Sequence, residues 1–190
     1  MTVILLTPRR FVDERGWFME TFHDRRYRDL GVKADFVQDN HSFSAPAGTI
    51  RGIHFQRAPH AQAKLVRCLR GRIFDVAVDL RPESPSFGHH IAAELSAENG
   101  HQLFIPAGYG HAFMTLGVGC EVAYKVDAHY APETEGGVRW DDPGLAIDWP
   151  LADAGVTRPV LSTKDAVLPL LADVAVDFAY DGRALLPIQS

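Results

Sequence analysis

The chain has 190 residues, of which 46% are apolar. It is therefore long enough to bury one sizeable core and short enough that a single domain is the default. Its net charge of -5 comes from 19 basic and 24 acidic residues that are scattered without long runs of either sign. Nucleic acid and anionic membranes are therefore poor candidates as main partners, and we expect a single domain over residues 1–190.

Short runs rich in Val, Ile, Phe and Tyr follow one another with Gly or Pro between them. This spacing predicts an all-β sandwich or barrel rather than alternating strands and helices. In chain order, we expect strands over 17–22, 36–40, 50–55, 64–69, 73–79, 102–105 and 120–127. Helix is expected only in short pieces, over 24–30 before Gly31 and after a capping Ser162. The tail over 174–190 alternates only weakly and its structure is left open.

The segment 73–79 has the clearest alternation in the chain. Large apolar side chains at even positions alternate with Asp75, Ala77 and Asp79, which predicts a half-buried strand. We expect its two acidic side chains to face outward into water.

Cys68 and Cys120 lie in strand-like apolar stretches and have neither zinc-site spacing nor the density of a disulfide scaffold. They are interpreted as buried thiols in a reducing compartment. The apolar run within the first ten residues is too short for a signal peptide, and no run is long enough to span a bilayer. We therefore expect a cytoplasmic protein.

The segment 100–111, GHQLFIPAGYGH, resembles the second motif of the cupins, in which a strand and a Pro-Gly turn precede an inward-pointing histidine. Cupins are small jelly rolls, in agreement with the strand spacing. Metal-binding cupins add a His-x-His pair and a nearby glutamate, but here Gln56 stands two residues after His54, and no glutamate lies between Gln56 and Lys64. Because His54 and His111 alone cannot supply three protein ligands, we expect a metal-free barrel. No redox or other cofactor is expected either.

Four polar residues lie on two successive predicted strands that are otherwise apolar: Arg51, His54, Gln56 and Lys64. Taken singly, each histidine could be structural and the lysine could lie on the surface. Buried polar groups without partners cost about 1–3 kcal/mol each, so a cluster of them is better explained as a ligand pocket.

The chain resembles the dTDP-4-dehydrorhamnose 3,5-epimerase family, a branch of metal-free cupins, from its first strand to about Leu171. Nine ordered segments at the family's spacing make chance agreement negligible. They are 13–20 (DERGWFME), 36–42 (FVQDNHS), 51–56 (RGIHFQ), 64–67 (KLVR), 75–81 (DVAVDLR), 84–88 (SPSFG), 105–113 (IPAGYGHAF), 124–125 (YK) and 161–165 (LSTKD).

The resemblance implies inversion of a carbon next to the ketone of a dTDP-4-keto-6-deoxysugar. His54 is implied as the base that removes the proton, and Asp165 as the group that holds its far nitrogen. Tyr124 is implied as the acid on the opposite face, and Lys64 as the group that stabilises the enolate oxygen.

The resemblance also implies how the substrate is held. Arg15, Arg51 and Lys164 are expected to grip the diphosphate, since forked or point cations suit phosphate oxygens. A homodimer is implied as well, in which an N-terminal strand carries Arg15 and Glu20 into the partner's pocket. The expected contacts to the sugar and base are Glu20, Gln38, Asp39, Asn40, His111 and Glu135, with Phe18 and Tyr130 as stacking partners for thymine.

Three other functions stay open at this point. A relative with the same base and acid could invert only C3 or only C5 of a modified deoxysugar. A metal-dependent cupin oxygenase or isomerase is a second alternative, and a cupin that binds sugar without catalysis is a third. Against the last stands the joint presence of His54, Lys64, Tyr124 and Asp165, which binding alone does not require.

Overall fold

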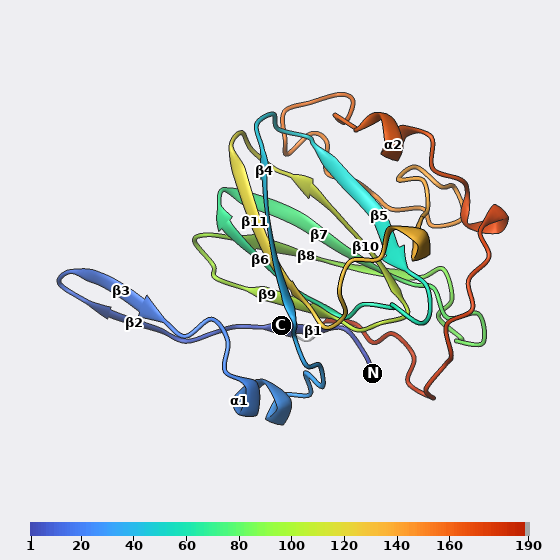
Figure 1. Cartoon of the computed structure of the whole chain (residues 1–190). Coiled ribbons are helices and arrows are strands. Elements are labelled where there is room, and N and C mark those ends of the chain that lie inside the picture. Colours follow the sequence, from blue (N-terminus) through green and yellow to red (C-terminus); the bar gives the residue numbers. More distant parts are fainter. Residues whose placement is uncertain (189–190) are drawn as a thin grey trace.

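The structure is a computed structural model that describes residues 1–188, and within them two antiparallel five-stranded sheets form a sandwich (Figure 1). Sheet I has the strand order β1 (Ile4–Leu6), β9 (Gln102–Ile105), β6 (Lys64–Arg70), β11 (Cys120–Val126) and β4 (Gln38–Ser44). Sheet II has the order β12 (Glu135–Gly137), β5 (Ile50–Gln56), β10 (Tyr109–Thr115), β7 (Arg72–Asp79) and β8 (His90–Ser96). The expected all-β jelly-roll class is confirmed.

Helices are short and lie outside the sheets. The α-helices are α1 (Asp24–Asp29) and α2 (Thr163–Ala166), and two 3-10 turns cover Pro132–Thr134 and Leu171–Asp173. No helix within residues 1–188 is long and apolar enough to cross a membrane.

A separate hairpin of β2 (Arg10–Asp13) and β3 (Gly16–Met19) projects away from the sandwich (Figure 1). Its apolar side chains are largely exposed, including Trp17 at 57% and Phe18 at 69%. Apolar surface of this kind on a projecting element is typical of an interaction site.

Apolar side chains form three layers of core. Side chains from both sheets, such as Val66 and Phe113, fill the space between them. The outer face of sheet II is covered by the chain after β12, with Trp149 packed among its side chains. The outer face of sheet I is covered by the segment around α1, through Tyr27.

The expectation that Asp75 and Asp79 face outward is wrong, because both are 0% exposed. The other face of β7 carries Val76 and Val78, and the chain after β12 covers that face. The acidic face is consequently the one that points between the sheets. The alternation was real, but it does not tell which of two faces a later segment will cover.

The predicted strands 50–55, 64–69, 73–79, 102–105 and 120–127 match the observed strands to within one residue at each end. The prediction 17–22 runs three residues beyond β3, and 36–40 covers only the first part of β4. Strands β1, β2, β8, β10 and β12 were not predicted. In β10 every side chain is buried, so the polar and apolar alternation that marks a half-buried strand is missing.

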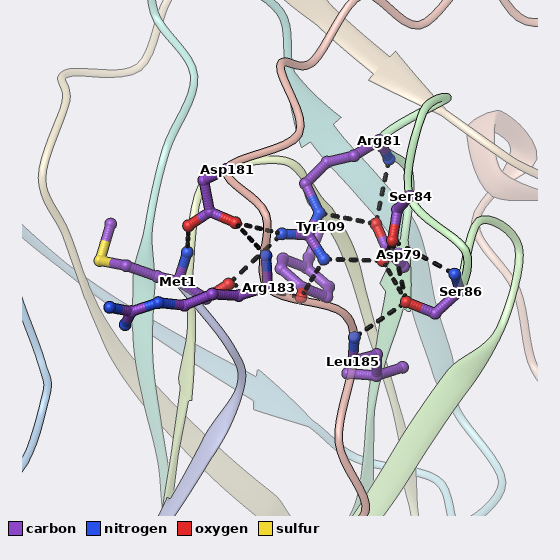
Figure 2. Close-up of polar contacts among 9 residues, drawn as sticks. All are labelled: Met1, Asp79, Arg81, Ser84, Ser86, Tyr109, Asp181, Arg183 and Leu185. Atoms are coloured by element: carbon purple, nitrogen blue, oxygen red, sulfur yellow. Dashed lines mark hydrogen bonds and ion pairs between the residues drawn. The ribbon is translucent and has the colours of Figure 1, made fainter.

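The tail, whose structure was left open, is tied to the ends of β7 and β10 (Figure 2). Buried Arg81 pairs with Asp79 at 2.7 Å and with Asp181 of the tail at 3.1 Å, and it donates to the Tyr109 hydroxyl at 2.5 Å. Asp181 also pairs with the N-terminal ammonium of Met1. The N-terminal residue and Asp181 of the tail therefore meet beside one buried guanidinium, which also donates to the Met1 carbonyl oxygen.

Candidate active site

A pocket of about 480 Å³ opens between the sheets, beside β4 and β5. His54, Lys64 and Tyr124 line it, and the same three residues also line an adjoining hollow of about 200 Å³. These three side chains, from β5, β6 and β11, therefore lie where the two hollows meet.

An irregularity in β5 turns both Arg51 and His54 toward this pocket. In a regular strand, residues three apart face opposite sides, but here the register with β10 shifts by one residue between them. Gly52 sits at this point with φ +121°, and a Cβ there would lie 2.5 Å from the backbone oxygen of His111. Only glycine fits, which explains the Arg-Gly-x-His sequence.

His54 is held from behind by Asp165. Its Nε2 lies 2.6 Å from Oδ1 of Asp165, which is 3% exposed. Burial raises the pKa of Asp165, but the hydrogen bond from His54 and the charge of that ring outweigh this and lower it. The carboxylate is therefore ionised and accepts the Nε2 hydrogen, which leaves Nδ1 of His54 unprotonated in the neutral ring.

The short helix α2 positions Asp165. The Ser162 hydroxyl caps the helix by accepting from the Asp165 backbone N–H at 3.0 Å, as the sequence predicted. The cap fixes the first turn and thereby the direction in which the carboxylate points.

A second histidine lies beside the first, because His111 of β10 is the direct cross-strand partner of His54. Its Nε2 lies 2.8 Å from Oδ1 of Asp75 on β7. Burial lowers the pKa of His111 and outweighs the charge and hydrogen bond of Asp75, which act to raise it. The ring is therefore neutral near pH 7.

Lys64 projects from β6 into the buried floor, where its Nζ lies 3.4 Å from the carbonyl oxygen of His54. Burial lowers its pKa to about 8, while the charges of Asp75 and Glu135 act against this change. The side chain is thus a desolvated ammonium at neutral pH, suited to stabilise a negative oxygen.

Tyr124 completes the group from β11, with its ring centroid 6.5 Å from that of His111. Burial raises its pKa, so its hydroxyl keeps its proton over the neutral range. Together with the imidazoles of His54 and His111, the pocket therefore offers one phenol and one ammonium, which is a set suited to moving a proton on carbon next to a carbonyl group.

Most of the predicted substrate contacts also line the two hollows. Gln38 donates to Asn40 at 2.9 Å, and Lys164 pairs with Glu135 at 2.5 Å. The hydroxyl of Tyr130 donates to Glu135 at 3.1 Å. The predicted residues that line one or both hollows are Gln38, Asn40, Arg51, His111, Tyr130, Glu135 and Lys164.

Four of the expected residues do not line either hollow of their own chain. Arg15 lies on the projecting hairpin, where it pairs with Asp13. Glu20 follows β3 and pairs with Arg26 at 2.8 Å. Asp39 alternates with Gln38 and Asn40 on β4, so its side chain points to the other face of sheet I, where it pairs with Lys125. Phe18, the other expected stacking residue, is on the hairpin as well.

Sequence reasoning missed two residues of the site. Phe113 lines the pocket and could have been found, because it lies two residues after His111 in one strand and so shares its face. Asp75 was expected in water, and nothing in the local pattern indicates its bond to His111. Within residues 1–188, no group of three histidine, cysteine or acidic side chains is placed to hold a metal ion.

Comparison with known proteins identifies the family. The family model described as dTDP-4-dehydrorhamnose 3,5-epimerase matches residues 1–173. The dTDP-4-dehydrorhamnose 3,5-epimerase of Sinorhizobium fredii is 49% identical over 178 residues, which cover 94% of this chain and 89% of that protein.

Solved structures agree with this. The crystal structure of the Bacillus anthracis enzyme of the same name, with TDP and PPi bound, is 49% identical with a TM-score of 0.84 and covers 88% of this chain and 93% of that one. The dTDP-6-deoxy-D-glucose-3,5-epimerase of Legionella pneumophila, in complex with dTDP-4-keto-L-rhamnose, is 42% identical with a TM-score of 0.85. That match covers 91% of this chain and 89% of the other.

Proposed function

The chain belongs to the dTDP-4-dehydrorhamnose 3,5-epimerase family, and we propose that it converts dTDP-4-dehydro-6-deoxy-D-glucose into dTDP-4-dehydro-L-rhamnose by inverting C3 and C5. It is an isomerase, and the step belongs to deoxysugar (rhamnose) biosynthesis. The observation that carries the proposal is the His54–Asp165 pair, at 2.6 Å, in the same pocket as Tyr124 and Lys64.

In this proposal, Nδ1 of His54 removes the proton from the carbon next to the 4-ketone. The ionised Asp165 keeps the ring in the correct tautomer and favours the imidazolium that forms. The Lys64 ammonium stabilises the developing enolate oxygen. Its attraction to that oxygen is strengthened because Lys64 is buried away from water. Tyr124 then delivers a proton to the other face. His54 releases its proton to solvent and Tyr124 regains one, after which the same steps at the second carbon complete the reaction.

The nucleotide is proposed to lie along the rim of the two hollows. Arg51 and Lys164 would bind the diphosphate oxygens, and Lys164 already pairs with Glu135 at this rim. Gln38, Asn40 and His111 would contact the sugar and base, with exposed Tyr130 as the stacking partner of thymine. No cofactor enters this scheme, because proton transfer needs only acids and bases.

We further propose a homodimer in which the hairpin enters the partner's site. Arg15 lies in the turn of this exposed apolar hairpin and Glu20 directly follows it, so both are outside the pocket of their own chain. This position suits residues that contact a substrate bound to the neighbouring subunit. A C2 dimer would exchange both hairpins and complete both pockets. A cytoplasmic location is also proposed, since the buried Cys68 and Cys120 thiols are free.

The test is incubation with dTDP-4-keto-6-deoxyglucose in deuterated water, followed by NMR. Deuterium at both C3 and C5, together with formation of the L-rhamno product, is expected. Deuterium and inversion at only one centre would show a single-centre epimerase, and no exchange would contradict catalysis altogether. Metal analysis of the purified protein tests the metal-dependent alternative. A stoichiometric ion bound by His54 and His111 would favour that alternative over the proposed proton transfer.

A further inference from the structure

Asp75 has no role in the chemistry proposed above, although it adjoins the site. It is fully buried, its Oδ1 lies 2.8 Å from Nε2 of His111, and it does not line the pocket. Its Oδ2 is buried without a hydrogen-bond partner among residues 1–188. Such an unpaired buried oxygen costs free energy, so the carboxylate needs an explanation other than stability.

The register of sheet II places Asp75 in a row with both histidines. Asp75 is the cross-strand partner of Phe113, so His111 is its diagonal neighbour on the same face. His111 in turn pairs with His54 on β5. Each imidazole therefore has its Nε2 bound to a carboxylate, one from β7 and the other from α2.

The free nitrogen of His111 is an acceptor. Its Nδ1 has no protein partner among residues 1–188 and is not among their buried unpaired atoms, so it is accessible from the pocket. With Asp75 as a carboxylate, the ring hydrogen lies on Nε2. A neutral ring then presents a lone pair at Nδ1, which can accept from a hydroxyl group but cannot donate to an enolate oxygen.

We propose, on the basis of the epimerase function above, that Asp75 is a positioning residue that holds His111 as the Nε2–H tautomer, so that Nδ1 accepts a hydrogen bond from a hydroxyl of the substrate sugar. Lys64 and His111 thereby make opposite kinds of hydrogen bond to the sugar ring. Lys64 donates to the ketone oxygen, and His111 accepts from a hydroxyl.

Asp75 has a second effect through its charge, which helps to keep Lys64 protonated. Replacement of the carboxylate by a neutral amide removes this attraction and lowers the Lys64 pKa from about 8. The alkaline limb of kcat/KM, where the ammonium loses its proton, then moves to lower pH. The titratable and charged groups around Lys64 on the packed elements are Asp75, Glu135, His54, His111, Tyr124 and Arg51.

The first experiment needs no substrate and so stands apart from the proposed function. Ring 15N NMR of the wild-type protein, with the His111 signals identified by their loss in His111→Gln, is expected to show a neutral Nε2–H ring. An Nδ1–H ring would overturn the proposal. If the wild type fails to epimerise its substrate, the proposed function fails while this measurement still decides the role of Asp75.

The second experiment compares Asp75→Asn with the wild type. An amide can donate or accept, so the tautomer becomes mixed and the KM rises by about tenfold, the amount expected for loss of one hydrogen bond, with less change in kcat. The alkaline limb moves to lower pH. In a His111→Gln background, Asp75→Asn is expected to add nothing to the KM, because it acts through that ring.

Asp79→Asn is the matched control, because Asp79 is a buried carboxylate on the same face of β7 whose hydrogen bonds go to Arg81 and two serines. It is expected to lower stability while the KM and the alkaline limb stay at their wild-type values. Unchanged KM and pH profile in folded Asp75→Asn, or equal changes in both variants, would overturn the proposal. If Asp75→Asn does not fold, the wild-type NMR result decides.

Discussion

Nε2 of His54 lies 2.6 Å from Oδ1 of Asp165, although 111 residues separate the two along the chain. His54 comes from a bulged strand and Asp165 from the capped first turn of α2. Neither element alone defines the pair. The fold has to bring α2, which follows β12 in the chain, next to β5 before the carboxylate of Asp165 can hold the ring of His54.

We predict that His54→Asn lowers proton exchange by about 10²–10⁴-fold, the usual contribution of a general base. Asp165→Asn should cause a smaller loss, since it removes only the group that orients the ring. Exchange is measured by deuterium incorporation at C3 and C5. His60→Asn is the control, because His60 lies outside the pocket, where it forms an exposed pair with Glu133 at 3.9 Å. Wild-type exchange in a folded His54→Asn protein would remove His54 from the mechanism.

Tyr124→Phe is predicted to separate exchange from inversion. The base and the Lys64 ammonium stay in place, so the enolate still forms but can regain a proton only from the side of His54. Deuterium should then enter substrate that keeps its configuration, while the wild type couples incorporation to inversion. Both are followed by NMR in one tube.

The control is Tyr27→Phe, which removes a hydroxyl that is bonded to Thr21 and Gln102 on the far face of sheet I. It should leave exchange and inversion unchanged. Inversion at the normal rate in Tyr124→Phe would show that its hydroxyl takes no part in the reaction.

Local sequence pattern predicted those strands that bury only one face or that stand between clear turns, such as β5, β9 and β11. It failed for β10, because every side chain of this strand is buried and its sequence lacks the alternation of polar and apolar residues. It also failed on the direction of Asp75, since the residues that cover the other face of β7 lie some seventy positions later in the chain, around Trp149.

For the site, the polar cluster of Arg51, His54 and Lys64 on two apolar strands was visible from physical reasoning alone. The partner of His54 was not, because no local rule links it to Asp165, and only the family resemblance supplied that pairing. The same resemblance named Arg15 and Glu20, whose own chain keeps them away from its pocket. The contact with a second subunit that we propose for both residues would leave no signal in the pattern of one chain.

The tail prediction concerns Arg81, which joins Asp79 to Asp181. Arg81→Met is expected to lower the free energy of unfolding by about 3–5 kcal/mol, because it leaves the buried Asp79 carboxylate without its cation. Arg72→Met is the control, since Arg72 forms an exposed pair with Glu94 and should cost about 0–1 kcal/mol. Urea unfolding measures both. Equal losses would show that the buried network does not anchor the tail.

The last prediction tests the exchanged hairpin by mixing two weakened proteins. Arg15→Ala should lower activity at substrate concentrations below the KM, because a phosphate contact is lost. His54→Asn should be inactive for the reason given above. If each hairpin serves the partner's pocket, a mixed dimer holds one pocket with an intact His54 that receives an intact Arg15.

Random reassembly of equal amounts should therefore restore about a quarter of the wild-type activity, since half of the dimers are mixed and each has one complete site. If Arg15 instead served its own pocket, every site in the mixture would carry one of the two defects. Activity would then stay at the average of the two separate proteins. Activity after joint unfolding and refolding, compared with simple mixing of the folded dimers, separates these outcomes, because folded dimers that do not exchange subunits cannot form the complete site.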